Sequence, residues 1–134
     1  MKVVIDTNVV IAALRNPASA AARIVEMAIS GEIQPLGSFK TKQETARLVQ
    51  RAGLGREAWL KVDRLLYRTS EVAPHTGFSI STDRSDNLYF EAAHAGGAAI
   101  IITSDRHLLE HDGFWGIRVM KPADFMKFIN ESRK

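Results

Sequence analysis

The sequence contains no cysteine, which excludes disulfide frameworks, thiolate zinc sites and cysteine nucleophiles. Any bound metal must therefore use oxygen or imidazole ligands. The chain also lacks an apolar run approaching the roughly 18 residues of a membrane span. Asp6 interrupts the apolar stretch at the start of the chain, where a signal peptide would continue without a charge. We therefore expect a cytoplasmic protein with no membrane partner.

The length and composition indicate one ordinary globular domain. A chain of 134 residues leaves no room for a second domain, so we expect a single domain over residues 1–134 with residues 130–134 as a frayed tail. The net charge of +3 at pH 7 is modest. It suits a polyanionic ligand, and it equally suits a plain soluble surface with a small excess of lysine and arginine.

Short apolar runs alternate with amphipathic segments along the chain. The strand candidates are residues 2–5, 33–36, 70–72, 98–103 and 117–120, and the helix candidates are residues 9–14, 18–30, 40–50, 56–68, 83–95, 105–111 and 122–129. Residues 74–81 contain proline and glycine and are interpreted as a loop. This alternation predicts a three-layer α/β/α domain around a mostly parallel sheet of about five strands, with residues 98–103 as an interior strand.

Four carboxylates fall at one predicted edge of this sheet. Asp6 and Asp105 each follow a strand, at the carboxyl ends where parallel α/β sheets bind ligands. Glu44 and Asp86 lie early in helices that begin near the same edge. Four such charges repel one another unless a cation is present, and ligation by oxygen alone selects Mg²⁺ or Mn²⁺. The grouping predicts hydrolysis of phosphodiester bonds.

Each of these acids also has a structural interpretation. Asp6 and Asp105 can cap the helices that follow them. Residues 41–44 fit a capping box that would explain Glu44, and Asp83 and Asp86 suit the first turn of a helix. Capping does not require all four acids to share one edge of the sheet, and this coincidence favours a functional site.

Three motifs carry a resemblance to a known family. They are VIDTNVV at residues 4–10, DRSDNLY at 83–89 followed by AGGA at 95–98, and ITSDRHLL at 102–109. The chain resembles the PIN domain family over nearly its whole length, specifically the VapC-like toxins of prokaryotic toxin–antitoxin systems. Arg84 stands where the family commonly has proline, and Ser104 replaces a glycine. The residues around Glu44 match poorly and carry more positive charge.

The resemblance implies an activity and a site. Asp6, Asp86 and Asp105 would bind Mg²⁺ or Mn²⁺, and Glu44 would complete the catalytic set by holding the metal or orienting the attacking water. The implied activity is metal-dependent cleavage of single-stranded RNA by an endoribonuclease. The implied partners are RNA, a cognate antitoxin protein and a second copy of the chain in a homodimer.

Further residues are expected to support the acids or to bind substrate. The supporting set is Thr7, Asn8, Asp83, Asn87, Thr103 and Ser104. The candidates for binding RNA phosphates are Lys40, Lys42, Arg47, Arg84 and Arg106. A solvated basic helix face explains the lysines equally well. Trp59, Trp115 and the phenylalanines mostly recur at core spacing and are interpreted as packing residues. The exception is Phe114 and Trp115, which lie in a predicted loop and are candidates for stacking on bases.

Two other functions remain open from the sequence. The first is a catalytically silent module that keeps the PIN scaffold and binds RNA or a protein through its basic helices. The second is a flavodoxin-like signalling receiver, which also places acids at strand ends, but this chain lacks a suitable lysine at a later strand end. The four histidines show no zinc-ligand spacing.

Overall fold

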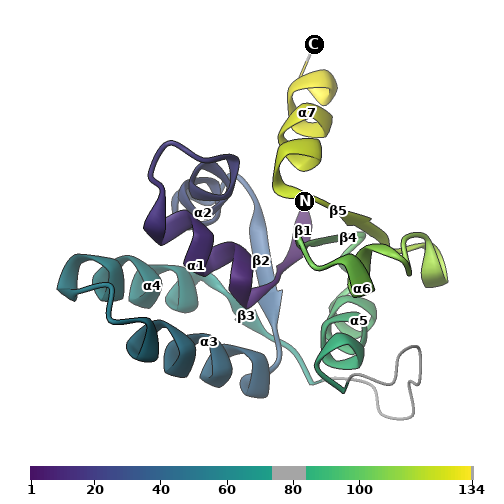
Figure 1. The fold of residues 1–134 in the computed structure, drawn as a ribbon. Coiled ribbons are helices and arrows are strands. Elements are labelled where there is room, and N and C mark those ends of the chain that lie inside the picture. The colour runs from purple at the N-terminus through teal and green to yellow at the C-terminus, as the bar shows by residue number, and fades with distance from the viewer. Residues whose placement is uncertain (74–83, 134) are drawn as a thin grey trace.

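The computed structural model describes residues 1–73 and 84–133, with the side chains of residues 84–86 outside that description. Within these ranges the chain forms seven α-helices and a five-stranded sheet, arranged as three α/β/α layers (Figure 1). The predicted loop over residues 74–81 lies outside the described residues. The predicted fold class is confirmed.

The sheet is parallel throughout. Its strands are β1 (Lys2–Ile5), β2 (Gln34–Gly37), β3 (Ser70–Glu71), β4 (Ile100–Ile102) and β5 (Arg118–Met120). They lie in the order β3-β2-β1-β4-β5, and every neighbouring pair is parallel. The carboxyl ends of all five strands therefore point in one direction. The run predicted to be interior is β4, which pairs with β1 on one side and β5 on the other.

Successive residues of the interior strands face opposite layers, as the two-residue period of a strand requires. Val3, Ile100 and Ile102 pack into one hydrophobic cluster, whereas Val4 and Ile101 pack into a second. Helices α1, α2, α3, α4 and α7 contribute buried residues to the first cluster, and α5 and α6 contribute to the second. The helix bounds are α1 (Thr7–Arg15), α2 (Ala20–Ser30), α3 (Phe39–Ala52), α4 (Arg56–Arg68), α5 (Arg84–Gly96), α6 (Arg106–Leu109) and α7 (Pro122–Ser132).

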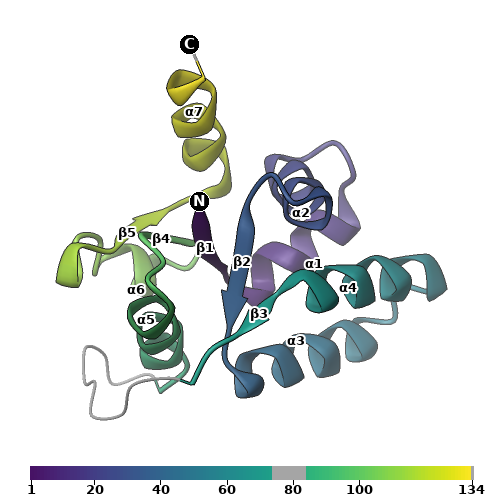
Figure 2. The same ribbon diagram turned by 180° about the vertical axis from the view of Figure 1, so that it is seen from behind.

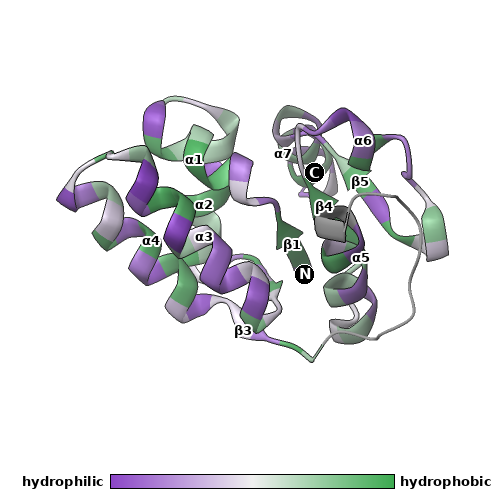
Figure 3. Cartoon of the chain, turned by 60° about the horizontal axis from the view of Figure 1, so that its bottom comes forward, coloured by the Kyte–Doolittle hydropathy of each residue, from purple (hydrophilic) through white to green (hydrophobic). Residues whose placement is uncertain are grey.

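The helices show the amphipathic character that a layered domain requires. In Figure 3 strands β1 and β4 are hydrophobic, while α3 and α4 alternate hydrophilic and hydrophobic residues. Figures 1 and 2 both place α7 at the end of the molecule opposite α3. Helix α7 ends at Ser132 and so includes part of the segment expected to fray. No helix in the described ranges combines the length and apolarity needed to cross a bilayer.

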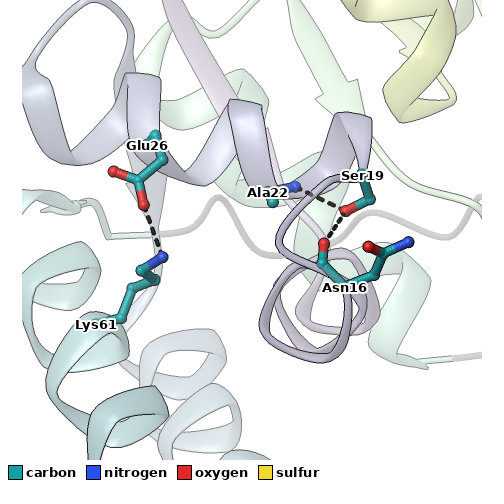
Figure 4. A network of polar contacts seen from close by, with 5 residues as sticks. All are labelled: Asn16, Ser19, Ala22, Glu26 and Lys61. Atoms are coloured by element: carbon teal, nitrogen blue, oxygen red, sulfur yellow. Dashed lines mark hydrogen bonds and ion pairs between the residues drawn. The ribbon is translucent and has the colours of Figure 1, made fainter.

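Helix α2 is held by a cap and by one ion pair (Figure 4). The Ala22 N–H donates to the Ser19 hydroxyl oxygen at 3.1 Å, and that hydroxyl donates to the Asn16 carbonyl at 2.7 Å. The Lys61 ammonium lies 2.7 Å from the Glu26 carboxylate and links α4 to α2. Such a cap stabilises a helix by about 1 kcal/mol, and an exposed ion pair contributes less than about 1 kcal/mol. The position of α2 therefore depends mainly on its buried apolar face.

Gly96 allows α5 to approach the sheet closely. A methyl group added there would lie 2.5 Å from the Leu36 Cδ1 atom and 2.9 Å from the Val72 Cγ1 atom, both shorter than normal contact distances. The next residue, Gly97, has a φ of +74° in the left-handed region that favours glycine. The two glycines of the AGGA motif therefore serve different purposes, namely close packing and chain reversal.

Strand β5 forms one edge of the sheet, and Asp112 protects part of that edge. The Asp112 Oδ1 atom accepts the Val119 N–H at 2.7 Å and the Arg118 Nε–H at 3.0 Å. Partial burial opposes ionisation of this carboxyl, but these two donors outweigh it and hold the pKa of Asp112 below its usual value. A side chain thus occupies a backbone donor that an edge strand would otherwise leave unpaired.

Candidate functional site

Strands β1 and β4 bring two of the predicted acids to one edge. The Asp6 N–H donates to the Ile102 carbonyl at 3.0 Å, which extends the β1–β4 ladder one residue past β1. Thr103 follows β4 directly, and Asp105 lies two residues later at the start of α6. Neighbouring strands lie about 4.8 Å apart, so the sheet itself sets the lateral spacing of Asp6 and the β4 end.

Asp6 is buried and accepts three hydrogen bonds. The residue is only 3% exposed. The Oδ1 atom accepts the Asn8 N–H at 3.2 Å and the Tyr89 hydroxyl at 3.0 Å, and Oδ2 accepts the Thr103 hydroxyl at 2.7 Å. The Asn8 bond makes Asp6 the N-cap of α1, so the capping interpretation holds. The other two bonds come from distant elements and serve no cap.

Asp6 has no basic partner among the described side chains. The three ion pairs found there join other residues, and none involves Asp6. Burying a carboxylate carries a desolvation cost, which hydrogen bonds reduce and a bound cation would reduce further. Its oxygen atoms match the ligand preference of Mg²⁺ and Mn²⁺. The chemistry and burial of this carboxylate therefore fit a divalent cation.

Tyr89 is a site residue that sequence reasoning missed. It lies on α5, is 7% exposed, and its oxygen accepts the Thr7 N–H at 3.3 Å while its hydroxyl donates to Asp6. Burial, and then the Asp6 carboxylate, raise the pKa of Tyr89 well above its usual value. The hydroxyl consequently keeps its proton and stays a donor. Its position three residues after Asp86, on the same face of the helix, was the available signal.

A second missed residue, Thr45, joins α3 to this network. The Thr45 hydroxyl donates to the Thr41 carbonyl at 2.9 Å, as an i to i−4 bond. The hydroxyl oxygens of Thr7 and Thr45 lie 2.8 Å apart. Because Thr45 has only one proton and directs it at Thr41, Thr7 must be the donor in this pair. The contact fixes α3 beside α1 at the residue that follows Glu44.

The structure overturns the capping-box interpretation of Glu44. Helix α3 begins at Phe39, and its N-cap is Ser38, whose hydroxyl oxygen accepts the Thr41 N–H at 3.1 Å. Glu44 therefore lies in the second turn, where it cannot reach the N-cap backbone. The observed cap lies three residues before Thr41, the residue that begins the predicted capping box. Glu44 is half-buried and keeps no helix-capping role.

Thr103 couples the two strand-end acids. It is fully buried, its hydroxyl donates to Asp6, and its oxygen accepts the Asp105 N–H at 2.9 Å. The Asp105 Oδ1 atom accepts the His107 N–H at 2.9 Å and caps α6. Asp105 is half-buried and Ser104 is exposed. One threonine thus ties the backbone of one acid to the side chain of the other.

The third predicted metal ligand is described only at the backbone. Asp86 lies in the first turn of α5, together with Arg84, and Asp83 lies outside the described residues. Asn87 follows and is half-buried. Among the described side chains, which exclude that of Asp86, no three His, Asp or Glu residues are close enough to hold a metal ion. The role of Asp86 stays a prediction.

The predicted phosphate-binding residues differ in their surroundings. Lys42 is half-buried, and its ammonium donates to the Thr69 carbonyl at 3.1 Å, which links α3 to the end of α4. Lys40 and Arg47 are exposed on α3, and Arg106 is exposed directly after Asp105. A cavity bordering Thr45 and Tyr89 measures about 30 Å³, room for one water molecule.

Comparison with known proteins identifies relatives of this chain. The profile of the PIN domain family matches residues 2–107. The uncharacterized protein MJ1680 of Methanocaldococcus jannaschii is 33% identical over 119 residues, which cover 81% of this chain and 74% of that protein. No solved structure gives a significant match. The matched range contains the strand-end acids, Tyr89 and the threonines that contact them.

Proposed function

This chain belongs to the PIN domain family, a nuclease-type fold, and from that premise we propose that it is a divalent-metal-dependent endoribonuclease acting on single-stranded RNA. The observation that carries the proposal is Asp6, a buried carboxylate with no basic partner among the described side chains. It lies at the carboxyl edge of a parallel sheet, where such folds bind their ligands.

The proposed metal ligands are Asp6, Asp86 and Asp105, with Mg²⁺ or Mn²⁺ as the ion. When bound, the ion would supply Lewis acidity that activates water and neutralises the phosphodiester charge. Tyr89 and Thr103 hold the Asp6 carboxylate in place through their hydroxyl groups. The sheet ladder and these bonds fix that carboxylate before any substrate arrives, which is the form of preorganisation that favours catalysis.

Glu44 is proposed to orient the attacking water or to hold the ion from the α3 side. Its half-buried position and the loss of its capping explanation support this assignment. Thr45 and Thr7 fix the adjacent turn of α3 to α1. Lys40, Arg47 and Arg106 are exposed near the acids and suit contacts with RNA phosphates.

We further propose a physiological role as the toxin of a toxin–antitoxin pair, in which a cognate antitoxin silences the nuclease and the chain forms a homodimer. This role rests on the resemblance of the three sequence motifs to VapC-like toxins. The rival is a catalytically silent module that binds RNA or protein through the same scaffold. The two differ in whether folded wild-type protein cuts RNA.

The test is cleavage of labelled single-stranded RNA by wild type, Asp6→Asn and Asp63→Asn, with Mg²⁺, Mn²⁺ or EDTA. Asp63 is an exposed acid on α4, so its replacement repeats the charge change away from the site. We expect metal-dependent cutting by wild type and Asp63→Asn and none by Asp6→Asn. Cutting retained by a pure, folded Asp6→Asn preparation refutes the assignment. Folded wild type that never cuts favours the binding module.

A further inference from the structure

Two aromatic side chains are exposed together between α6 and β5. Phe114 and Trp115 belong to a short 3₁₀ turn, Phe114–Gly116. Their ring centroids lie 5.6 Å apart with planes inclined by 11°, so the rings are stacked. Phe114 is 37% exposed and Trp115 is 56% exposed. We call this pair the aromatic platform. Their exposure agrees with the sequence analysis, which set Phe114 and Trp115 apart from the aromatic residues expected in the core.

The backbone of this turn adopts a conformation that carries a steric cost. Trp115 has a φ of 55°, and among the described residues it alone has a positive φ without being glycine. Bulky side chains rarely adopt this left-handed region. Gly113 and Gly116 flank the pair with φ of 92° and 74° and allow the chain to form the turn. An exposed indole held on unfavourable backbone gains little for folding, and such combinations occur at functional positions.

The rings are anchored to α5. The fully buried Phe90 ring meets Phe114 edge to face, with centroids 6.0 Å apart and planes at 85°. The His94 ring lies against Trp115 with centroids 4.3 Å apart. These contacts restrict the rotation of the Phe114 and Trp115 rings. A ligand that binds them would therefore cause a smaller loss of side-chain entropy. The same helix carries Asp86 and Tyr89 nearer its start.

We propose that the aromatic platform stacks an unpaired base of single-stranded RNA, an inference that rests on the RNA substrate proposed above. Stacking on exposed aromatic rings is a general means of binding single strands, because every base offers a flat π surface. His94 follows Tyr89 by five residues, which is about 7.5 Å along the helix axis. Because Tyr89 contacts the acidic site and His94 contacts the aromatic platform, the stacked base would lie away from the cleaved phosphodiester bond. It would belong to a nucleotide next to the one that is cut.

The size of the patch favours a base over a protein surface. A stable protein interface buries about 800 Å² on each partner, which requires many contiguous residues. Among the residues that the structure describes, the other large exposed apolar side chains lie elsewhere along the chain: Met1, Phe39, Leu60 and Tyr67. Two stacked rings at one turn match the dimensions of a base, and a protein contact becomes an alternative outcome of the test.

The test uses Trp115 as its own reporter. The chain has two tryptophans, so a Trp59→Phe background leaves Trp115 as the single source of indole fluorescence. The probe is a short oligoadenylate, titrated in EDTA to suppress metal-dependent cleavage, beside an abasic strand of equal length. We expect the oligoadenylate to quench Trp115 and the abasic strand to bind more weakly without quenching. A direct binding assay with labelled strand should show about tenfold weaker affinity for Trp115→Asn, since asparagine tolerates the left-handed backbone.

The matched control is Tyr67→Ala, which removes an aromatic ring that is 89% exposed on α4 and should leave affinity unchanged. Trp115→Phe should retain most of the binding because it keeps a ring. Equal affinity of wild type and Trp115→Asn for the oligoadenylate refutes the platform. If that variant instead loses only self-association in sedimentation, the patch is a protein contact and the proposal is wrong.

The platform and the nuclease fail in distinguishable ways. Base-dependent quenching of Trp115 without any cleavage in Mg²⁺ or Mn²⁺ refutes the nuclease and supports the platform. Cleavage of long strands with a KM that Trp115→Asn does not alter refutes the platform and supports the nuclease. If both hold, the variant raises KM for long strands, leaves kcat unchanged, and does not affect substrates too short to reach the turn.

Discussion

Tyr89→Phe tests the polar network around Asp6 without creating a cavity. The replacement keeps the ring and removes an oxygen that donates to the Asp6 carboxylate at 3.0 Å and accepts the Thr7 N–H at 3.3 Å. Losing a hydrogen bond to a charged group costs about 1.5–3 kcal/mol, and a buried donor left without a partner costs about 1–3 kcal/mol. The two costs overlap, so we expect the free energy of unfolding to fall by about 2–4 kcal/mol.

Urea denaturation measures this loss. With a slope of about 2 kcal/mol per molar urea, a typical value for a small domain, the midpoint should fall by about 1–2 M at an unchanged slope. Tyr67→Phe, at an exposed position, is the matched control and should not shift the midpoint. A Tyr89→Phe midpoint that coincides with wild type would show that the two hydrogen bonds make no net contribution to stability.

The pH dependence provides a second test of the same contact. The pKa of Tyr89 is raised in the folded protein, whereas in the unfolded chain it takes its ordinary value of about 10. The contribution of Tyr89 to stability is therefore complete below pH 10 and declines above it, as the unfolded chain loses a proton that the folded chain keeps. The difference in stability between wild type and Tyr89→Phe should shrink as the pH rises above 10. A difference that stays constant to pH 11 refutes this account.

Two further changes probe the packing and the sheet edge. Gly96→Ala should lower the free energy of unfolding by about 1–3 kcal/mol, because the new methyl group overlaps Leu36. Gly97→Ala should lower it by about 1 kcal/mol through backbone strain alone. Thermal unfolding of both variants distinguishes the two causes, and equal losses of stability contradict the packing argument. Asp112→Asn should remove a stabilisation that is present above about pH 4 and lost as the pH falls through the lowered folded pKa of Asp112. Parallel acid titrations of wild type and variant should therefore converge at low pH, and a constant offset contradicts the linkage.

Much of the fold follows from hydrophobic periodicity. The apolar run before Thr103 indicated a strand covered on both faces, and β4 is such a strand. Turn residues fixed several element ends, as where Gly31 ends α2 in the left-handed conformation. The predicted ends of elements without such a signal were less accurate. Helix α7, for example, runs three residues beyond its predicted end at Ile129.

The candidate site was only partly predictable because its contacts are long-range. Asp6 and Asp105 were placed at one edge by the rule for parallel sheets, and the structure connects them through Thr103. Tyr89 is 83 residues from Asp6 in sequence, and no local pattern pairs a helix tyrosine with a strand-end aspartate. Thr45 is likewise 38 residues from Thr7 in sequence, and no local pattern predicts their contact. Such partners follow from how the elements pack, which short-range propensity does not specify.

The sheet edges have a consequence for how this protein assembles with others. At β5 the carboxylate of Asp112 already occupies the outward Val119 N–H, and at the opposite edge β3 offers only two residues. Within the described part of the chain, neither edge gives an incoming strand a long row of free backbone groups, so extension of the sheet into a neighbouring molecule is disfavoured. We therefore expect any protein partner to bind through helices and loops rather than by adding a strand, and we expect the protein to resist cross-β polymerisation at high concentration.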